Sequence, residues 1–231
     1  MEWLLQLLLI PKRMRFRWRN RNRRKVTEGL IVVLKQRCDE ATRANVPAYL
    51  GVYNVGLFIA LLEQDISAYS ESIFFAKSEW KRQFFARGLA VLLHEGAEDV
   101  SQLLGKQYRN WLNVLELDDN WITALNEINA KLSQFQKNNS RFLKKVRNYV
   151  GAHRDHNAST QLDILSDLKA IEVYRLGAEF SEPLRNLVTF YTQLLTYMHN
   201  PAVMLHQASK VTSWLNRPLD TDELDKTART G

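Results

Sequence analysis

The chain of 231 residues is 45% hydrophobic and 25% charged, which is ordinary for a globular protein and argues against bulk disorder. Nine glycines and five prolines are too few to punctuate a many-stranded β fold, so the composition favours helices. The single cysteine, Cys38, excludes an internal disulfide and a CxxC-type site, and we therefore expect a reducing, cytoplasmic compartment.

The formal net charge of +7 is concentrated at the N-terminus. Residues 1–25 hold nine Lys or Arg against one acid, Glu2, so this segment carries +8 and the remaining residues sum to −1. A near-neutral body excludes a nucleic-acid binder whose whole surface is basic.

The first residues form a short apolar segment, Trp3–Ile10, which is followed by the basic one. A membrane-spanning helix needs roughly 20 apolar residues, so we expect no transmembrane segment here. In a signal peptide the positive charge comes before the apolar region, whereas here it comes after, so we do not expect secretion.

Arginine occupies every second position from Arg13 to Arg23, with aromatic residues interleaved. On an extended chain these arginines would share one face, and cations with aromatics suit phosphate contact and base stacking. The candidate nucleic-acid-binding residues of this arm are Arg13, Arg15, Arg17, Trp18, Arg19, Arg21, Arg23 and Arg24. Three alternatives stay open: contact with an anionic membrane surface, a flexible solvated tail, and an upstream extension with the functional start nearer Met14.

From Val26 onward the apolar periodicity predicts successive amphipathic helices without strand alternation. They are expected over residues 26–44, 54–76, 78–105, 118–153, 159–177, 181–200 and 201–216, with a connection over 109–117. The expected N-caps are Ser78, Asp118 or Asp119, and Ser181, with Pro183 in a first turn. We therefore predict an all-α bundle of about five to seven helices over residues 26–216, between a flexible basic arm (1–25) and a polar tail (217–231).

The longest expected helix, residues 118–153, carries a stripe spaced alternately by four and three residues. Its members are Trp121, Leu125, Ile128, Leu132, Phe135, Asn139, Phe142, Val146, Tyr149 and His153. The histidine that ends this stripe would point toward packed protein rather than bulk water. Arg147 would lie about 120° around the helix and about 9 Å along it from His153, so both side chains can line one groove.

Arg147 and His153 together suit RNA cleavage that needs no metal, and we assign no metal or cofactor. An imidazole with an unperturbed pKa of about 6.5 can take the proton of a 2′-hydroxyl, which then attacks the adjacent phosphodiester. A guanidinium can hold the phosphorane on which negative charge develops.

The string RNYVGAH resembles the R-x4–6-H motif of the HEPN superfamily, because polar Asn148 follows Arg147 and His153 comes after five intervening residues. Its place late in a long helix of an all-α bundle is similar too. The resemblance implies a dimerising helical domain that in many members is a metal-independent endoribonuclease of toxin–antitoxin, abortive-infection or CRISPR defence, and in others binds RNA without cleaving it. It implies Arg147, Asn148 and His153 as catalytic residues, RNA as the substrate, a homodimer as the assembly and an antitoxin protein as a partner.

A structural interpretation of the same residues stays open. A histidine that ends an apolar stripe is often a packed, hydrogen-bonded residue, and a cation is favoured in the last turn of a helix. Arg147 would then pair with an acid of a neighbouring helix, and residues 153–157 would form a polar exit loop. Such a protein would be a non-enzymatic binding or scaffold module whose basic arm contacts RNA or an anionic membrane.

Two further patterns contain residue types that can bind metals. The string HRDHN offers too few ligands for a metal site. In HEGAE (94–98), Glu98 stands where a zinc-binding helix needs its second histidine, so that motif fails. Glu95 lies at the border of an apolar face, where we expect it to be solvated, with support of the Arg147 guanidinium as the alternative.

Overall fold

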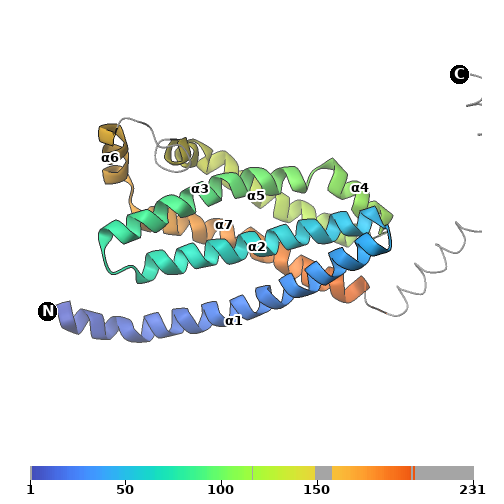
Figure 1. Cartoon of the computed structure of the whole chain (residues 1–231), viewed down its shortest axis with the longest axis horizontal. Helices are drawn as coiled ribbons and strands as arrows, with labels where there is room; N and C mark the ends of the chain where they lie inside the picture. Colours follow the sequence, from blue (N-terminus) through green and yellow to red (C-terminus); the bar gives the residue numbers. More distant parts are fainter. Residues whose placement is uncertain (1, 116, 149–157, 199, 201–231) are drawn as a thin grey trace, which may run out of the picture. The chain divides into compact units, whose positions relative to one another are not determined.

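The computed structural model describes residues 2–115, 117–148, 158–198 and 200, and for residues 2–17, 19, 158, 160, 161, 164 and 165 it describes the backbone alone. Figure 1 shows the helices that these residues form. They are α1 (Glu2–Arg43), α2 (Pro47–Phe75), α3 (Glu79–Leu103), α4 (Lys106–Val114), α5 (Asp119–Val146), α6 (Ala158–Asp167) and α7 (Ala170–Met198). The described residues contain no strand, so the prediction of an all-α bundle is confirmed.

Helix α1 runs without a break through residue 25, where we expected an arm to give way to the first helix of the body. Lysine, arginine and leucine are good helix formers, and the first glycine of the chain is Gly29. In an α-helix, residues two apart lie about 200° around the axis, so alternating arginines do not share one face. The extended arrangement with a single arginine face therefore does not occur.

Helix α1 pairs with α2 along a stripe whose composition changes along its length. The buried apolar residues of the stripe are Leu30, Leu34, Cys38 and Ala41. Before Leu30, the buried side chains that the structure describes in α1 are polar, namely Asn20 and Thr27. Apolar burial therefore holds the helix from Leu30 onward, whereas polar contacts hold residues 20–27 before it.

The turn between α1 and α2 is shorter than expected, because α2 begins at Pro47 rather than near residue 54. Proline fits the first position of a helix, where its fixed φ is suitable and its missing N–H needs no partner. Asn45 in the turn has φ 54°, in the left-handed region that asparagine tolerates better than most residues.

Two predicted helix starts are confirmed by side-chain capping. The Oγ of Ser78 accepts a hydrogen bond from the Lys81 N–H at 3.3 Å, and Ser78 is the N-cap of α3. The Oδ1 of Asp118 accepts from the N–H groups of Asn120 and Trp121 at 3.1 and 3.4 Å, which makes it the N-cap of α5. In both cases a short polar side chain satisfies helix N–H groups that have no partner within the helix.

Residues 106–114 form the short helix α4, where a non-helical connection over 109–117 was expected. Tyr108 and Leu112 lie one turn apart and are both buried, so this segment has one apolar face. Trp111 rests on Gly51 of α2, where a Cβ would lie 2.5 Å from the Cδ2 atom of the indole. The expectation of a connection was wrong because a nine-residue helix has too short a pattern to stand out in sequence.

The stripe of α5 was predicted correctly in its first half and drifts in its second. Leu125, Ile128, Leu132 and Phe135 are buried, and so is the later stripe member Val146, but Phe142 is 37% exposed and Leu143 is 1% exposed in its place. A strict seven-residue repeat drifts by about 20° per heptad on a straight α-helix, or about 60° over three heptads. The buried face therefore passes from the position of Phe142 to that of Leu143.

The boundary between the last two helices lies at residues 168–169 rather than near residue 178. Ser181 was expected to cap a new helix, but α7 runs through it and the side chain is buried. Pro183 lies inside α7, although a proline there removes one backbone hydrogen bond. This expectation was wrong because the packing of Phe180 and Leu184, both fully buried, outweighs the local stop signal.

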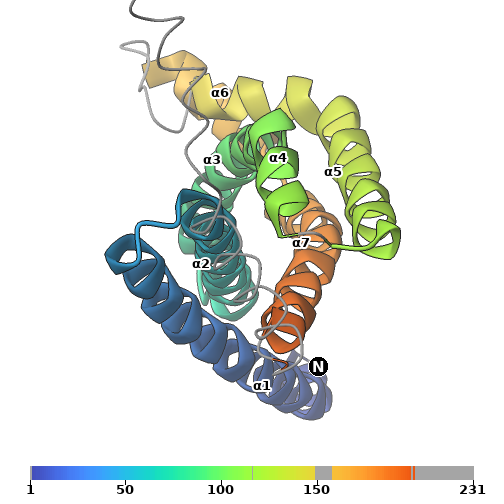
Figure 2. The ribbon, with the colours of Figure 1, turned by 90° about the vertical axis from the view of Figure 1, so that its right-hand side faces the viewer.

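The segment of α7 from Ala170 to residue 190 lies between α2 and α5, as the view in Figure 2 shows. The ring of Tyr174 lies 6.3 Å from that of Phe74 in α2, and the ring of Phe180 lies 4.8 Å from that of Phe135 in α5. The segment of α7 from Ala170 to residue 190 therefore forms part of the core with α2 and α5.

The chain divides into two compact units, Met1–Phe190 and Tyr191–Gly231. All the packing given above lies within the first unit. In the second, the described residues continue α7 to Met198, and the N–H of Asn200 donates to the carbonyl of Tyr197 at 3.0 Å. The helix expected over 201–216 and the tail expected over 217–231 lie outside the described residues. None of the helices in the described part of the chain combines the length and the apolar character that crossing a membrane requires.

Candidate functional site

Arg147 and Asn148, the first two residues of the candidate catalytic motif, lie at the end of α5. The helix proper ends at Val146, and the next two residues wind into a wider π-type turn. The Arg147 N–H still donates to the carbonyls of Leu143 and Lys144. Single π-turns are frequently found at functional sites in helices, although the turn alone assigns no function.

The Arg147 side chain reaches across to α3 and pairs with Glu95. Its Nε atom lies 3.3 Å from the Glu95 Oε1 atom, and the two side chains are 34% and 47% exposed. We expected Glu95 to be solvated, but it pairs with Arg147. The alternative, in which Arg147 pairs with an acid of a neighbouring helix, is the one that the structure shows. In so exposed a position the pair stabilises the fold by less than about 1 kcal/mol, so its main effect is to orient the guanidinium.

Asn148 forms the second contact of the guanidinium. The Arg147 Nη1 donates to the Asn148 Oδ1 at 3.4 Å, near the upper limit of hydrogen-bond distances. Arginine has donors on Nε, Nη1 and Nη2, and these two contacts do not use Nη2. Arg147 can therefore keep both partners and still donate to an incoming phosphate oxygen.

The third motif residue, His153, lies outside the described residues, as do the other residues of HRDHN. The structure thus brings Arg147, Asn148 and Glu95 together and leaves the relation of the histidine to them as a prediction.

Metal ligands do not gather in the part of the chain that the structure describes, where no group of three His, Cys, Asp or Glu side chains could hold an ion. In the failed zincin-like motif, His94 is buried in α3 with its Nε2 3.8 Å from the Glu98 Oε1. This i, i+4 arrangement places a carboxylate where a zinc site would need the second nitrogen.

The basic residues of α1 fall into two groups. Arg23 pairs with Glu63 of α2 at 3.1 Å, and Arg24 pairs with Glu71 of the same helix. Both of these candidate nucleic-acid-binding arginines therefore form ion pairs with α2. The alternating charges in the sequence do not indicate these pairs. The acids that they contact lie 40 and 47 residues away along the chain.

The other described members of the basic segment face outward. Trp18 is 66% exposed, and Arg21 and Lys25 are exposed as well. These three lie at spacings of three and four residues and thus share one side of α1. The remaining candidates, Arg13, Arg15, Arg17 and Arg19, are positions of α1 whose side chains the structure does not describe.

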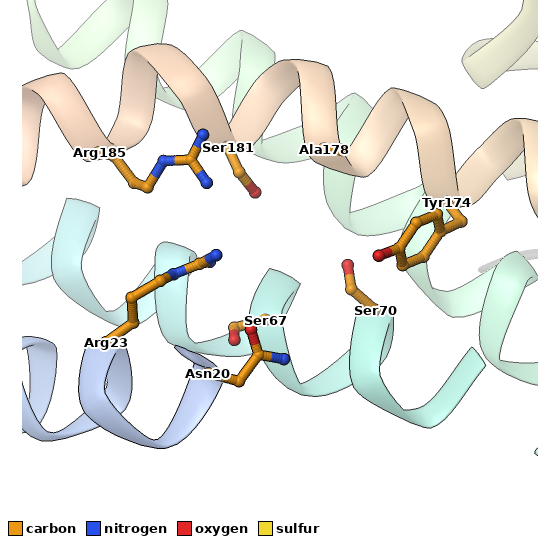
Figure 3. Close-up of a pocket in the computed structure, with 8 residues that line it drawn as sticks. All are labelled: Asn20, Arg23, Ser67, Ser70, Tyr174, Ala178, Ser181 and Arg185. Atoms are coloured by element: carbon orange, nitrogen blue, oxygen red, sulfur yellow. The ribbon is translucent and has the colours of Figure 1, made fainter. Parts of the chain in front are cut away.

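Polar residues surround a cavity between α1, α2 and α7, which Figure 3 shows; the sequence pattern singled out only Arg23 and Ser181 among them, and for other roles. Ser67 and Ser181 are buried there, and Arg185 faces Arg23. The signal that could have pointed to them is a serine at a core position of an otherwise apolar helix face, which is weak without knowledge of the neighbouring helix.

Comparison of the chain with protein-family models, with curated proteins and with solved structures gave no match, so the HEPN resemblance stays a prediction from the motif and its place in the helix.

Proposed function

We propose that the chain is an RNA-interacting helical-bundle protein of HEPN type, in which Arg147 binds an RNA phosphate and His153 is the base of a metal-independent cleavage. The observation that carries the proposal is the Arg147–Glu95 pair, which holds a partly exposed guanidinium across α3 and α5. An arginine fixed in this way is preorganised to bind phosphate, and arginine suits this task because its planar fork matches phosphate oxygens.

The proposed reaction needs no group other than RNA and these side chains. The His153 imidazole takes the proton of the 2′-hydroxyl, and the 2′-oxygen bonds to phosphorus. The P–O5′ bond breaks, and the 5′-oxygen takes a proton from water. The products are a 2′,3′-cyclic phosphate and a 5′-hydroxyl end, while Arg147 offsets the negative charge on the phosphorane.

The assembly that we propose is a homodimer in which two such motifs face each other across an interface, with an antitoxin protein as a further partner. This arrangement would place the histidine between subunits, which agrees with the sequence prediction that His153 ends an apolar stripe.

The test is cleavage of a mixed-sequence RNA in EDTA by the full chain and three variants. We expect Arg147→Ala and His153→Ala each to lower the rate by at least about 100-fold. His156→Ala, a histidine change three residues further on, is the matched control and should cleave like the unaltered protein. A substrate with 2′-O-methyl riboses should not be cut, because the nucleophile is blocked.

Glu95→Gln separates the catalytic interpretation from the structural one. It removes the charge of Glu95 but keeps an amide oxygen that can accept the hydrogen bond from the Arg147 Nε, so the guanidinium stays oriented and most of the cleavage that Arg147→Ala loses should remain. If the unaltered protein does not cut RNA in EDTA, or if His153→Ala cuts equally well, the ribonuclease proposal is wrong.

A second candidate function rests on the outer side of α1, where Trp18, Arg21 and Lys25 are exposed together. A cation for phosphate beside an indole for stacking suits single-stranded RNA without cleavage. Arg21→Gln with Trp18→Ala should then weaken RNA binding and reduce its dependence on salt. Arg24→Gln, which removes an equal charge from the bundle side, is the control, and equal weakening by both changes would contradict this candidate. Binding to anionic vesicles in place of RNA would also contradict it.

A further inference from the structure

Two large aromatic side chains are exposed side by side near the start of α3. Trp80 is 62% exposed and Phe84 is 55% exposed. They lie four positions apart in the helix, so their side chains are neighbours on its surface. Single exposed apolar residues are ordinary on a protein surface, but two adjacent rings of this size leave a contiguous apolar patch in contact with water, which is typical of a binding surface. We call these two residues the aromatic pair.

The aromatic pair is held in place by its neighbours on the same helix. The guanidinium carbon of Arg87 lies 5.9 Å from the centroid of the Trp80 ring and 5.5 Å from that of Phe84, which is within the range of cation–π contacts. The ring of Phe85 meets that of Phe84 edge to face, with 5.5 Å between the centroids. Rings that are already ordered lose little conformational entropy when a flat partner stacks on them.

The charges beside the aromatic pair favour a negatively charged partner. Lys77 precedes α3 and Lys81 lies in its first turn; both are exposed, and neither forms an ion pair with another described residue. The charge of Arg82, in contrast, is offset by Glu79. Two such lysines next to two stacking surfaces suit a single-stranded nucleic acid, which carries phosphates and flat bases, better than they suit an apolar peptide.

The same face of α3 leads to the proposed RNA site. Positions 80, 84, 87, 91 and 95 of α3 fall within about 80° around the helix axis. The last of them, Glu95, holds the Arg147 guanidinium of α5 at 3.3 Å. Along the axis, Phe84 lies about 16 Å and Trp80 about 22 Å before Glu95, which an extended strand of a few nucleotides can span. A strand with its phosphate at Arg147 can therefore reach the aromatic pair.

The second half of α3 disfavours the opposite path for such a strand. Residues 88–103 contain Glu95, Glu98 and Asp99 but no lysine or arginine. Arg147 offsets the charge of Glu95, whereas Glu98 and Asp99 are exposed carboxylates that repel phosphates. The charge along α3 thus directs a strand from Arg147 toward the start of the helix, where the aromatic pair lies.

We propose that the aromatic pair of α3 stacks on the bases of a single-stranded RNA whose phosphate is bound at Arg147. The substrate is then unpaired RNA with several nucleotides on one side of the cleaved bond, because bases inside a duplex cannot stack on side chains. The proposal rests on the proposed function, since it extends the RNA site at Arg147.

The first measurement is the binding of a fluorescein-labelled, single-stranded RNA of about 12 nucleotides with 2′-O-methyl riboses, which the full chain can bind but not cut. Trp80→Ala with Phe84→Ala should raise the dissociation constant at least about tenfold. Trp80→Phe with Phe84→Tyr keeps both rings and should bind within about threefold of the unaltered chain. The matched control is Val32→Ala with Leu61→Ala, which removes two exposed apolar side chains from α1 and α2 and should leave the binding unchanged.

The salt dependence of binding tests the lysines. Lys77→Gln with Lys81→Gln should reduce the slope of log Kd against log salt concentration by about 1.4, the value for two phosphate contacts on a single strand. Lys35→Gln with Lys131→Gln removes the same charge from exposed ion pairs of α1 and α5 and should leave the slope unchanged. The same RNA annealed to its complement should bind more weakly than the single strand.

Cleavage of the same RNA with ordinary riboses, measured in EDTA, separates this proposal from the proposed function. The alanine change of the aromatic pair should lower kcat/KM by about the factor by which it raises the dissociation constant. If the aromatic pair contributes to binding but the unaltered chain does not cut the RNA, the proposed cleavage is wrong and the stacking surface stands.

The opposite results overturn the stacking surface and leave the cleavage proposal intact. They are a chain that cuts RNA equally well with and without the aromatic pair, an equal loss of binding in the Val32→Ala and Leu61→Ala control, or a preference for the duplex. Absence of RNA binding also overturns the stacking surface and leaves the aromatic pair to a protein partner.

Discussion

Arg23 of α1 and Glu63 of α2 form an ion pair in which the acid is buried, with only 4% of its side chain exposed, while the arginine reaches solvent. The pair joins α1 to α2, and its two residues lie 40 positions apart in sequence. Loss of the arginine would leave a carboxylate in the bundle without its cation, so the pair constrains where α1 can lie.

We expect Arg23→Ala to lower the free energy of unfolding by about 2–4 kcal/mol, because it leaves a buried charge unpaired. Urea denaturation measures the change. Lys131→Ala is the matched control, since Lys131 pairs with Glu182 at 3.3 Å but both side chains are more than half exposed. It should cost less than about 1 kcal/mol. Equal costs for the two changes would show that Glu63 is not buried as the structure has it.

The contact between Gly51 and Trp111 predicts opposite effects for two glycine substitutions. Gly51→Ala places a methyl group 2.5 Å from the indole and should destabilise the fold by about 1–3 kcal/mol. Gly29→Ala in α1 has nothing within 4 Å of the new methyl group and should stabilise by up to about 1 kcal/mol, since alanine is the better helix former. Midpoints of thermal or urea unfolding compare the two, and two shifts of the same sign would contradict the packing of α4 on α2.

The drift of the α5 stripe predicts unequal effects for two adjacent residues. Leu143→Ala removes a fully buried side chain and should cost about 2–5 kcal/mol. Phe142→Ala removes a larger but partly exposed side chain and should cost less than Leu143→Ala, on the order of 1 kcal/mol. Denaturant titration measures both costs. A larger cost for Phe142→Ala than for Leu143→Ala would show that Phe142 is the buried residue, as the strict heptad repeat predicts.

Stability should fall at alkaline pH through Tyr53. Burial raises the pKa of the Tyr53 phenol from 10.0 to about 12. Its folded-state pKa lies above its unfolded one, so its contribution is fully present below pH about 10 and is lost as the pH rises through about 12. The full contribution is about 2–3 kcal/mol. Across this range the unfolding free energy of the unaltered chain should fall by about 2–3 kcal/mol relative to that of Tyr53→Phe, because only the phenol ionises. A constant difference between them would contradict the prediction.

Local signals in the sequence predicted much of this fold. Ser78 and Asp118 cap their helices through contacts with residues two or three positions away, which a sequence pattern contains. By contrast, α7 continues through Ser181 and Pro183 because of burial against other helices, and no local pattern reports that. The register of α5 was predicted correctly from Leu125 to Phe135 and again at Val146, and it was wrong at Phe142, where the angular mismatch brings Leu143 to the buried face instead.

The candidate site shows the same division between local and distant contacts. Arg147 and Asn148 are neighbours in sequence, so the motif identified them together. Glu95 lies 52 residues before Arg147, and its pairing depends on how α3 and α5 pack. The cavity draws on three helices that are far apart in sequence, and no local pattern indicates that these helix faces meet. The sequence therefore placed Arg23 in a flexible basic arm.

The change in composition along α1 has a consequence for how that helix opens. The part from Leu30 onward is held by apolar burial, which added salt does not weaken. The part before it is held by the ion pairs of Arg23 and Arg24, which salt screens. The rate of amide hydrogen exchange should therefore depend on salt in one part of α1 and not in the other. The amides around Arg23 should exchange faster in high salt, whereas the exchange rate of those around Leu34 should not change.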